Sequence, residues 1–430
     1  MSGGILSLTP LTCRTLHRIS QSGAPDGRDP PETRGRPAVR TTGRRPFTGA
    51  RLAHRRGPPV RTAGGRSGLA DDPPGITHMR TSLLLVTLGV SLAATAAPHA
   101  RQQAPVQIAS ASPAPAGAVY PTAEWERHSQ AGWSQPLLKA ARDYMAARQT
   151  SAVMIVQGGR VVDQWGDTTR KINMRSARKS MLSALYGIHV AEGHIDLGRT
   201  MGELGIDDNE PSLTDIEKQA TILDLLRARS GVYHPAAYET PGMKAARPKR
   251  SSQLPGTAYY YNNWDFNALG TIFEKLTGKK IFEEFEARIA GPIGMQDFRA
   301  SDGKYETAAD SIHAAYPFRM TARDMARFGY LYLRGGRWGE RQVVPAEWVR
   351  RSTTPYTTDL EPPYPGYGFL WWVNDTGFAA HGLGGHVIHV VPSRDLVIVH
   401  RVANDDDTAI QVAYQDIDVM IRLIIAAAPK

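Results

Sequence analysis

The chain of 430 residues contains a single cysteine, Cys13. One thiol cannot close an intramolecular disulfide, and Cys13 lies in an N-terminal segment that we expect to be separate from the folded part. We therefore expect the folded part to have no disulfide, no thiol nucleophile and no cysteine-ligated metal ion. The sequence also lacks a Gly-x-Ser-x-Gly nucleophile elbow, a His-Glu-x-x-His zinc motif, a Gly-x-x-x-x-Gly-Lys-Ser/Thr phosphate loop and a complete Gly-x-Gly-x-x-Gly. These absences predict a protein that uses no metal ion and no cofactor.

Residues 1–78 contain no lysine, but they hold thirteen arginines and five acidic residues, which is +8 of the chain's net charge of +10. The segment is rich in Gly, Pro and Arg, and it cannot bury enough apolar surface to offset the entropy lost on ordering. We interpret it as a disordered upstream extension, with translation starting at Met79. A basic nucleic-acid-binding arm or a basic tail without a specific role are the alternatives. Because only one aromatic residue, Phe47, and no binding motif lie among the arginines, we expect no nucleic-acid partner.

Long apolar runs are also missing. The apolar stretch at residues 83–92 is shorter than the roughly 20 residues that a membrane span needs. It follows Met79-Arg80 and precedes Ala94-Thr95-Ala96, and this layout predicts a secretory signal peptide over residues 79–97. We therefore expect a periplasmic or secreted protein without a stable membrane anchor. The Ala/Pro/Gln/Ser-rich residues 98–121 are expected to form a flexible lead-in.

The rest of the chain, residues 122–430, has the periodicity of a folded domain. Apolar spacing predicts helices over 133–149, 176–192, 221–229, 263–276, 321–333 and 410–427, and alternation predicts strands over 152–156, 160–165, 367–373, 378–381, 386–391 and 396–401. Consecutive strands joined by short turns favour an antiparallel sheet. We predict an α/β (α+β) fold in which helices flank an antiparallel sheet and a mostly helical lobe, roughly residues 190–310, is inserted.

A serine and a lysine are three residues apart at the start of the second predicted helix. Ser176 and Lys179 therefore lie on one helix face, where the amine can activate the hydroxyl as a nucleophile. A second pair with the same spacing, Ser301 and Lys304, is expected in a non-helical turn because Asp and Gly interrupt it. We expect only the first pair to be catalytic.

Tyr261-Asn262-Asn263 follows Ser176 at a distance of 85 residues. With Ser176 and Lys179 as a Ser-x-x-Lys motif and Tyr261 and Asn263 as a Tyr-x-Asn motif, the chain resembles the serine β-lactamase and penicillin-binding protein superfamily. The resembling branch holds class C β-lactamases, DD-peptidases, related esterases and amidases, and 6-aminohexanoate-oligomer hydrolases. The resemblance spans residues 125–428 and implies a β-lactamase/transpeptidase-like fold.

The third motif of that superfamily, Lys-Thr-Gly or His-x-Gly on a strand, is altered in this sequence. The corresponding stretch is Ala380-His381-Gly382-Leu383. One alignment places Ala380 where relatives carry a cation, and a shift by one residue places His381 there and Leu383 in place of the glycine. Neither alignment provides a lysine. The departure counts against penicillin-like substrates and favours neutral esters or amides.

The resemblance implies a role for each matching residue. Ser176 attacks a carbonyl carbon to form an acyl-enzyme, and Lys179 or a Tyr261 phenolate takes its proton. The backbone N–H groups of Ser176 and Leu383 form an oxyanion hole, with Gly382 allowing close approach of the substrate. Asn263 orients the acyl group, and Tyr261 activates the deacylating water.

We therefore predict an exported serine hydrolase that acts on a small-molecule ester or amide, including a short peptide or amide oligomer. A DD-peptidase or class C-type β-lactamase is the alternative within the enzyme class, and a catalytically inactive ligand-binding protein on the same scaffold is the alternative outside it. The basic run at residues 247–250 is interpreted as a solvated loop, with an anion-attracting patch beside Tyr261 as its alternative. The natural substrate and the oligomeric state do not follow from the sequence.

Overall fold

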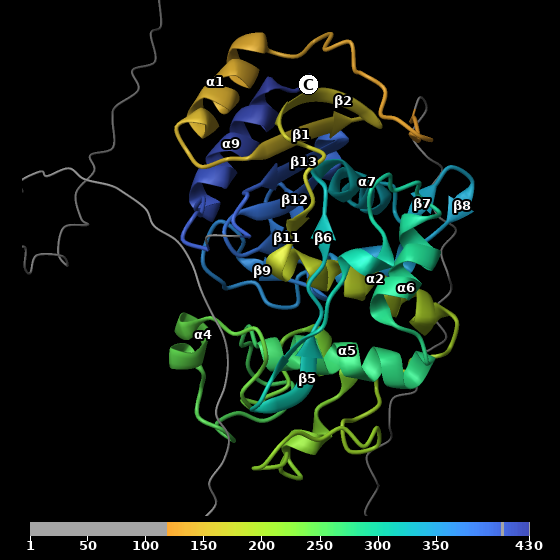
Figure 1. The fold of residues 1–430 in the computed structure, drawn as a ribbon, viewed down its shortest axis with the longest axis vertical. Helices are drawn as coiled ribbons and strands as arrows, with labels where there is room; N and C mark the ends of the chain where they lie inside the picture. The colour runs from red at the N-terminus through yellow and green to blue at the C-terminus, as the bar shows by residue number, and fades with distance from the viewer. Residues whose placement is uncertain (1–117, 406–407, 430) are drawn as a thin grey trace, which may run out of the picture. The chain divides into compact units, whose positions relative to one another are not determined.

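A computed structural model describes residues 118–405 and 408–429 of the protein, and the predicted upstream extension and signal peptide lie outside these residues. Its centre is a seven-stranded antiparallel sheet with the strand order β2-β1-β13-β12-β11-β10-β9 (Figure 1). The strands of this sheet are β1 (Ala152–Gln157), β2 (Arg160–Gly166), β9 (Gly366–Tyr367), β10 (Trp372–Asn374), β11 (Gly377–Gly382), β12 (His386–Val391) and β13 (Leu396–Arg401). The predicted antiparallel sheet is thus confirmed.

The sheet separates two apolar cores. On one face, α1 (Gln135–Ala146) and α9 (Tyr414–Ala427) lie side by side, and they bury side chains such as Ile155 and Ile398. On the other face, α7 (Ala322–Leu333) crosses the central strands and covers the alternate side chains, such as Met154 and Val399 (Figure 1). Because successive side chains of a strand point to opposite faces, both faces are apolar and both are covered.

The segment between the β1–β2 hairpin and the C-terminal strands is mostly helical. Its longer helices are α2 (Arg178–Ala191) and α5 (Asn263–Thr277), and α2 contacts α5, α6, α8 and the sheet strand β11. The remaining elements are α3 (Ile222–Leu226), α4 (Pro241–Ala246), α6 (Ile281–Phe285), α8 (Ala346–Ser352), the 3-10 turns η1 (Arg175–Ala177), η2 (Glu217–Gln219), η4 (Ala300–Asp302) and η5 (Pro392–Arg394), the π-helical turn η3 (Glu286–Ala290), and the short strands β3 (Ile172–Asn173), β4 (Glu306–Ala308), β5 (Ser311–Ala315), β6 (Arg319–Met320), β7 (Arg337–Trp338) and β8 (Arg341–Gln342).

Most predicted elements are confirmed, with differences at their ends. Helices α1, α2, α3, α5 and α7 match their predictions within three residues at each end, whereas α9 begins at Tyr414, four residues after its predicted start. The single strand predicted over 367–373 is wrong. Leu370 has a left-handed φ of 64° and the Gly368 N–H donates to the Trp371 carbonyl at 2.8 Å, so the chain turns back on itself and forms two paired strands, β9 and β10.

Both edges of the sheet bond to other backbone segments of the chain. At the β2 edge, the Val161 N–H donates to the Glu126 carbonyl, and the Val161 carbonyl accepts from the His128 N–H. At the other edge, β9 is two residues long, and Tyr367 exchanges backbone hydrogen bonds with residues 356 and 357. The adjoining segments therefore bond to the start of β2 and to β9. None of the helices in the described part of the chain is long and apolar enough to cross a membrane.

Candidate active site

The predicted nucleophile lies at the junction of η1 and α2. Ser176 is the middle residue of η1, which runs directly into α2. The preceding residue, Arg175, has a left-handed φ of 52°, and its N–H donates to the Asn173 side-chain oxygen at 2.8 Å. This local hydrogen bond sets the direction of the turn. It presents Ser176 at the buried start of α2 and within a pocket.

Lys179 connects the first two predicted motifs. Its Nζ lies 2.9 Å from Ser176 Oγ, 2.7 Å from the Tyr261 hydroxyl and 2.9 Å from Asn263 Oδ1. The lysine is only 2% exposed, and its Nζ also lies 4.3 Å from the centroids of the Tyr261 and Phe266 rings. The structure therefore brings Ser176, Lys179, Tyr261 and Asn263 together around one nitrogen.

Burial decides which of these groups can act as a base. Desolvation lowers the pKa of the Lys179 amine well below its ordinary value, and the positive charge of Arg178 lowers it further. Desolvation raises the pKa of Tyr261 to about 12, although Ser176 and Arg178 partly offset the rise. Burial thus shifts both groups towards their neutral forms, the free amine of Lys179 and the protonated phenol of Tyr261. These directions favour Lys179 over a Tyr261 phenolate as the group that takes the serine proton.

Asn263 is the first residue of α5 and does not cap it. The N-cap is Asn262, whose side chain accepts a hydrogen bond from the Trp264 N–H at 3.1 Å. The Asn263 side chain is therefore free of the capping role, and it donates to the Tyr238 carbonyl at 2.8 Å while its oxygen faces Lys179. The two neighbouring asparagines thus have different roles, because Asn262 caps α5 and Asn263 contacts Lys179.

In the third motif, one residue faces the core and the next faces the pocket. Ala380 is fully buried in the core on the α7 side of the sheet, whereas His381 and Leu383 line the pocket. Gly382 passes so close to η1 that an added Cβ would lie 2.0 Å from the Met174 carbonyl oxygen. This contact favours the alignment in which Gly382 is the motif glycine. His386 points away, is buried, and has its Nε2 3.1 Å from Asn404 Oδ1.

His381 is enclosed by aromatic rings. It stacks on Tyr414 with centroids 4.6 Å apart and on Trp372 at 5.8 Å, and it meets Tyr364 edge-on at 4.0 Å. Burial lowers the pKa of His381 well below its usual value, and the nearby His389 adds to the effect. Its Nε2 makes no hydrogen bond to another described residue. The third motif thus presents the neutral His381 ring to the pocket, whereas Ala380 faces the core.

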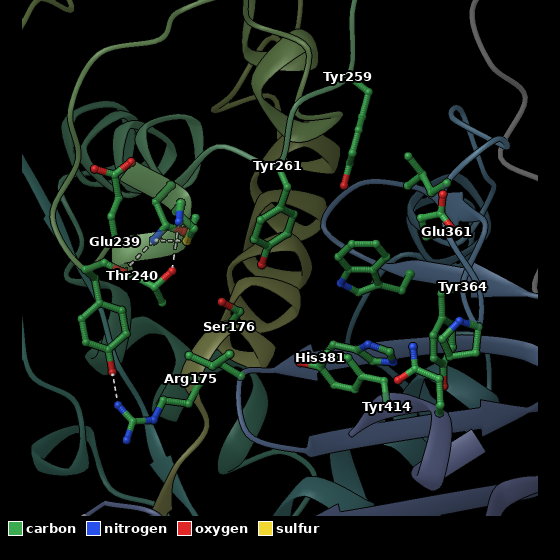
Figure 2. Close-up of a pocket in the computed structure, with 18 of the residues that line it drawn as sticks. Arg175, Ser176, Glu239, Thr240, Tyr259, Tyr261, Glu361, Tyr364, His381 and Tyr414 are labelled. Carbon is green, nitrogen blue, oxygen red and sulfur yellow. Dashed lines mark hydrogen bonds between the residues drawn. The ribbon is translucent and has the colours of Figure 1, made fainter. Parts of the chain in front are cut away.

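The site opens into a pocket of about 640 Å³. Figure 2 shows Ser176 pointing towards the hydroxyl end of Tyr261, with Arg175 and His381 on either side. The sequence analysis missed several lining residues, because they come from segments that are far apart in the chain: Arg175, Tyr238, Glu239, Tyr259, Tyr364, Trp372 and Tyr414. Only Arg175 had a local indication, since it precedes the nucleophile.

The basic run at 247–250 does not line the pocket. Arg247 forms an ion pair with Glu239 at 2.5 Å, and Arg250 pairs with Glu217 at 2.7 Å and also donates to two backbone carbonyls. These cations are therefore used in structural contacts. Arg175 does line the pocket, and its guanidinium donates to the Tyr238 hydroxyl at 3.3 Å and to the Asn404 carbonyl at 3.0 Å. No ion pair of Arg175 occurs within the described residues.

The second Ser/Lys pair lies away from this site. Ser301 is within the 3-10 turn η4. The prediction that this segment is not helical is therefore wrong for the three residues of η4. Lys304 follows the turn and pairs with Glu306 at 3.0 Å, and neither residue lines the pocket. Within residues 118–405 and 408–429, three potential metal ligands come together only at His189, Glu192 and His194, which are also outside the pocket.

Comparison with known proteins agrees with this geometry. A family model described as Beta-lactamase matches residues 137–415. A Bacillus anthracis protein assigned as a 6-aminohexanoate-dimer hydrolase is 22% identical with a TM-score of 0.54, over 72% of this chain and 89% of that one. A Bacteroides dorei protein assigned as a beta-lactamase is 17% identical with a TM-score of 0.52, over 69% and 99%. An uncharacterised protein of Alkalihalophilus pseudofirmus is 21% identical over 283 residues, 58% of this chain and 82% of its own.

Proposed function

The chain belongs to the beta-lactamase family, and we propose that it hydrolyses a neutral ester or amide through an acyl-enzyme on Ser176. The observation that carries this proposal is the position of Lys179 Nζ, which is buried and within hydrogen-bond distance of both Ser176 Oγ and the Tyr261 hydroxyl. A nucleophile and a base at this separation, with a third group orienting the base, form the arrangement that covalent catalysis requires.

In the acylation step, the neutral Lys179 amine takes the Ser176 proton as Oγ attacks the substrate carbonyl carbon. The C–O bond forms, and the carbonyl electron pair moves onto oxygen. The backbone N–H groups of Ser176 and Leu383 would stabilise this oxyanion, and Gly382 permits the close approach of β11 to η1 that brings them together. The oxyanion then re-forms the carbonyl and the bond to the leaving group breaks, while the proton passes from Lys179, by way of the Tyr261 hydroxyl, to the leaving alcohol or amine.

Deacylation uses the same groups, with water as the attacking group and Ser176 as the leaving group. Lys179, oriented by Asn263 and Tyr261, accepts a proton from water as the water oxygen attacks the acyl carbon. Ser176 Oγ leaves and recovers a proton from Lys179. Because the pKa of Tyr261 is raised to about 12, its hydroxyl acts as a donor and relay and not as a phenolate base. In this mechanism Lys179 is the base in both steps. It takes the role of the Tyr261 phenolate as the alternative base for Ser176, and the role of Tyr261 as the group that activates the deacylating water.

The walls of the pocket support a neutral substrate. His381 stands at the third motif as a neutral ring between Trp372 and Tyr414, so no permanent positive charge comes from that strand. The unpaired Nε2 of His381 is suited to one hydrogen bond with a neutral polar group of the substrate. Aromatic rings around it would bury an apolar acyl or alcohol group.

A second candidate function, hydrolysis of a carboxylate-bearing amide as in a DD-peptidase or β-lactamase, rests on Arg175. Its guanidinium lines the pocket and holds only neutral partners among the described residues. An arginine can bind a carboxylate in a bidentate fashion, which would replace the missing lysine of the third motif. Arg175 is therefore a more suitable anion anchor than the paired Arg247 or Arg250.

The test is turnover of purified protein on short-chain esters, a linear amide dimer and a chromogenic cephalosporin, each with wild type and Ser176→Ala. The amide dimer is included because the B. anthracis protein is assigned as a dimer hydrolase. We expect the esters or the amide to have the highest kcat/KM, and Ser176→Ala to abolish turnover and labelling by a fluorophosphonate. Absence of turnover and labelling in the wild type would support the catalytically inactive binding protein instead.

A matched pair of neutral and carboxylate-bearing substrates separates the two candidate functions. We expect the neutral member to be preferred, with little change in this preference in Arg175→Gln. A strong preference for the carboxylate that Arg175→Gln removes, and that Arg247→Gln retains, would overturn the neutral-substrate proposal. Arg247→Gln is the matched control because it removes a nearby cation that is already paired with Glu239.

A further inference from the structure

Two histidines meet at the C-terminal end of α2, on the side of the molecule away from the pocket lining. The helix ends in a Schellman turn, in which the His194 N–H donates to the His189 carbonyl at 2.9 Å and the Gly193 N–H donates to the Val190 carbonyl at 3.1 Å. Gly193 takes the left-handed conformation, with φ of 78°, that this turn requires. The turn brings the side chains of His189 and His194 together, a contact that is usually made by two apolar residues.

The ligand atoms of this cluster are close enough to share one ion. His189 Nδ1 and His194 Nδ1 are 3.1 Å apart, and Glu192 Oε2 lies 3.8 Å and 3.4 Å from them. A tetrahedral zinc ion with bonds of about 2.0–2.1 Å separates its ligand atoms by about 3.3 Å. Shifts of a few tenths of an ångström therefore complete three ligand positions, and the fourth faces solvent.

A second layer of contacts orients the buried histidine. His189 Nε2 lies 3.0 Å from Glu284 Oε1 on α6, and Arg288 approaches the same carboxylate at 3.3 Å. An ionised Glu284 only accepts hydrogen bonds, so Nε2 carries the hydrogen and the Nδ1 lone pair points at the cluster. The Phe273 ring packs edge-on against the His189 ring at 5.1 Å and fixes its plane. A carboxylate behind a histidine is the usual second layer of zinc sites.

The carboxylate of Glu192 is arranged in the same way. Its Oε1 accepts from Arg288, and its Oε2 accepts a longer bond from the same guanidinium at 3.4 Å while it also faces the two histidine nitrogens. The His194 side chain is 55% exposed, so an ion can enter from solvent without unfolding the turn. In the absence of metal, the Nδ1–H of His194 donates to the Nδ1 of His189. Metal binding needs only the shift of the His194 hydrogen to its solvent-accessible Nε2.

We propose that His189, Glu192 and His194 bind one divalent transition-metal ion of the zinc type. Two imidazole nitrogens and one carboxylate oxygen suit Zn²⁺, whereas Mg²⁺ and Ca²⁺ prefer oxygen ligands only. The cation would sit where the carbonyl groups of α2 converge, and positive charge is favourable at a helix C-terminus. The ion would fasten the end of α2, the helix that carries Lys179, to the following turn, so its role is structural and separate from the reaction at Ser176.

Equilibrium dialysis of the metal-depleted full-length chain against Zn²⁺ tests this site. We expect one Zn²⁺ per chain, no competition from excess Mg²⁺ or Ca²⁺, and a rise in Tm with Zn²⁺. Glu284→Gln should weaken binding by about 10–100-fold, the usual effect of losing the second layer, and His194→Ala should weaken it more. The readout does not depend on hydrolysis, and Ser176→Ala should bind Zn²⁺ as the wild type does.

Two control variants and one alternative test variant make the outcome decisive. His128→Ala removes a partly exposed histidine outside the cluster, and Cys13→Ser removes the chain's thiol, so both should retain wild-type affinity. Glu192→Gln serves where His194→Ala is unstable, because it keeps the shape of the side chain. The proposal is overturned if the wild type binds no stoichiometric Zn²⁺, or if His194→Ala and Glu192→Gln both bind it with wild-type affinity.

Discussion

The Lys179 side chain combines burial with three polar contacts of its nitrogen, to Ser176, Tyr261 and Asn263. Removing an ammonium from water disfavours its charged form, so burial itself prepares the amine to accept a proton. The same burial raises the pKa of Tyr261 and keeps its hydroxyl available to donate. One physical cause therefore assigns opposite roles to two neighbouring groups, without a cation from the third motif.

Lys179 and Tyr261 are expected to behave as one unit, because each is useful only when the other is in place. Lys179→Ala and Tyr261→Phe should each lower kcat by about 10²–10⁴, the range for general acid–base groups. The double variant should be little slower than the slower single variant. Steady-state kinetics on a common ester measure this, and additive losses in the logarithm of kcat would show that the two residues act independently.

The pH dependence of the reaction should follow the proton on Lys179. Its pKa is lowered in the folded protein, so the neutral amine becomes available as the pH rises through a value well below the ordinary lysine pKa of about 10.4. We expect kcat/KM to rise with pH over that window and then reach a plateau, since Tyr261 ionises only near pH 12. A pH–rate profile that first rises only near the ordinary lysine pKa would contradict a desolvated amine.

Among individual residues, Ser176 and Lys179 were predictable from the sequence because helix geometry fixes their spacing, whereas Tyr261 and Asn263 were predicted from the resemblance to a known superfamily. Ser176 and Lys179 are one turn apart on a helix face, and the contact is confirmed at 2.9 Å. The aromatic enclosure of His381 was not predictable, because Tyr364, Trp372 and Tyr414 come from separate segments that only the tertiary fold unites. The His189–His194 contact was missed since it depends on the geometry of the turn after α2.

At the scale of elements, the site depends on how closely β11 approaches η1. The sequence left two alignments of the third motif open, since alternation along a strand shows which residues share a face but not which face meets the pocket. The structure places Ala380 in the core and His381 in the pocket, and the close contact of Gly382 with Met174 favours the alignment in which Gly382 is the motif glycine. The strand predicted over 367–373 failed for a related reason, because an apolar run does not reveal a left-handed residue such as Leu370 within it.

Gly382→Ala should separate β11 from η1. The new Cβ would lie 2.0 Å from the Met174 carbonyl oxygen and 3.1 Å from the Arg175 and His386 Cβ atoms, so backbone must move. We expect kcat to fall by about 10²–10³, as for the loss of an oxyanion-hole donor, together with a lower Tm.

Gly198→Ala is the matched control for that substitution. Gly198 is exposed, and an added Cβ would meet only the Asp196 side-chain oxygen at 3.4 Å. Its kcat and Tm should stay close to those of the wild type. If Gly382→Ala were equally silent in kcat, the proposed oxyanion hole between Ser176 and Leu383 would be wrong.

For the whole molecule, charge and composition divide the chain near Met79. Residues 1–78 carry +8, and the remaining 352 residues carry the other +2 of the net charge. We propose that the protein is exported by the signal peptide predicted over residues 79–97. Expression from both candidate start sites in a bacterial host, followed by N-terminal sequencing, should give a secreted product that begins near Ala97. A secreted product that retains residues 1–78 would contradict the proposal that translation starts at Met79.

The two covered edges of the central sheet have a consequence for the protein at high concentration. A strand with free backbone N–H and C=O groups is a template on which another chain can add, which leads to aggregation. Here the β2 edge already bonds to residues 126 and 128, and the opposite edge ends in the two-residue β9, bonded to residues 356 and 357. In the described part of the chain, Val161 at one edge and Tyr367 at the other already have backbone partners. Strand addition by a second copy at these positions would first have to displace the segments that bond to them.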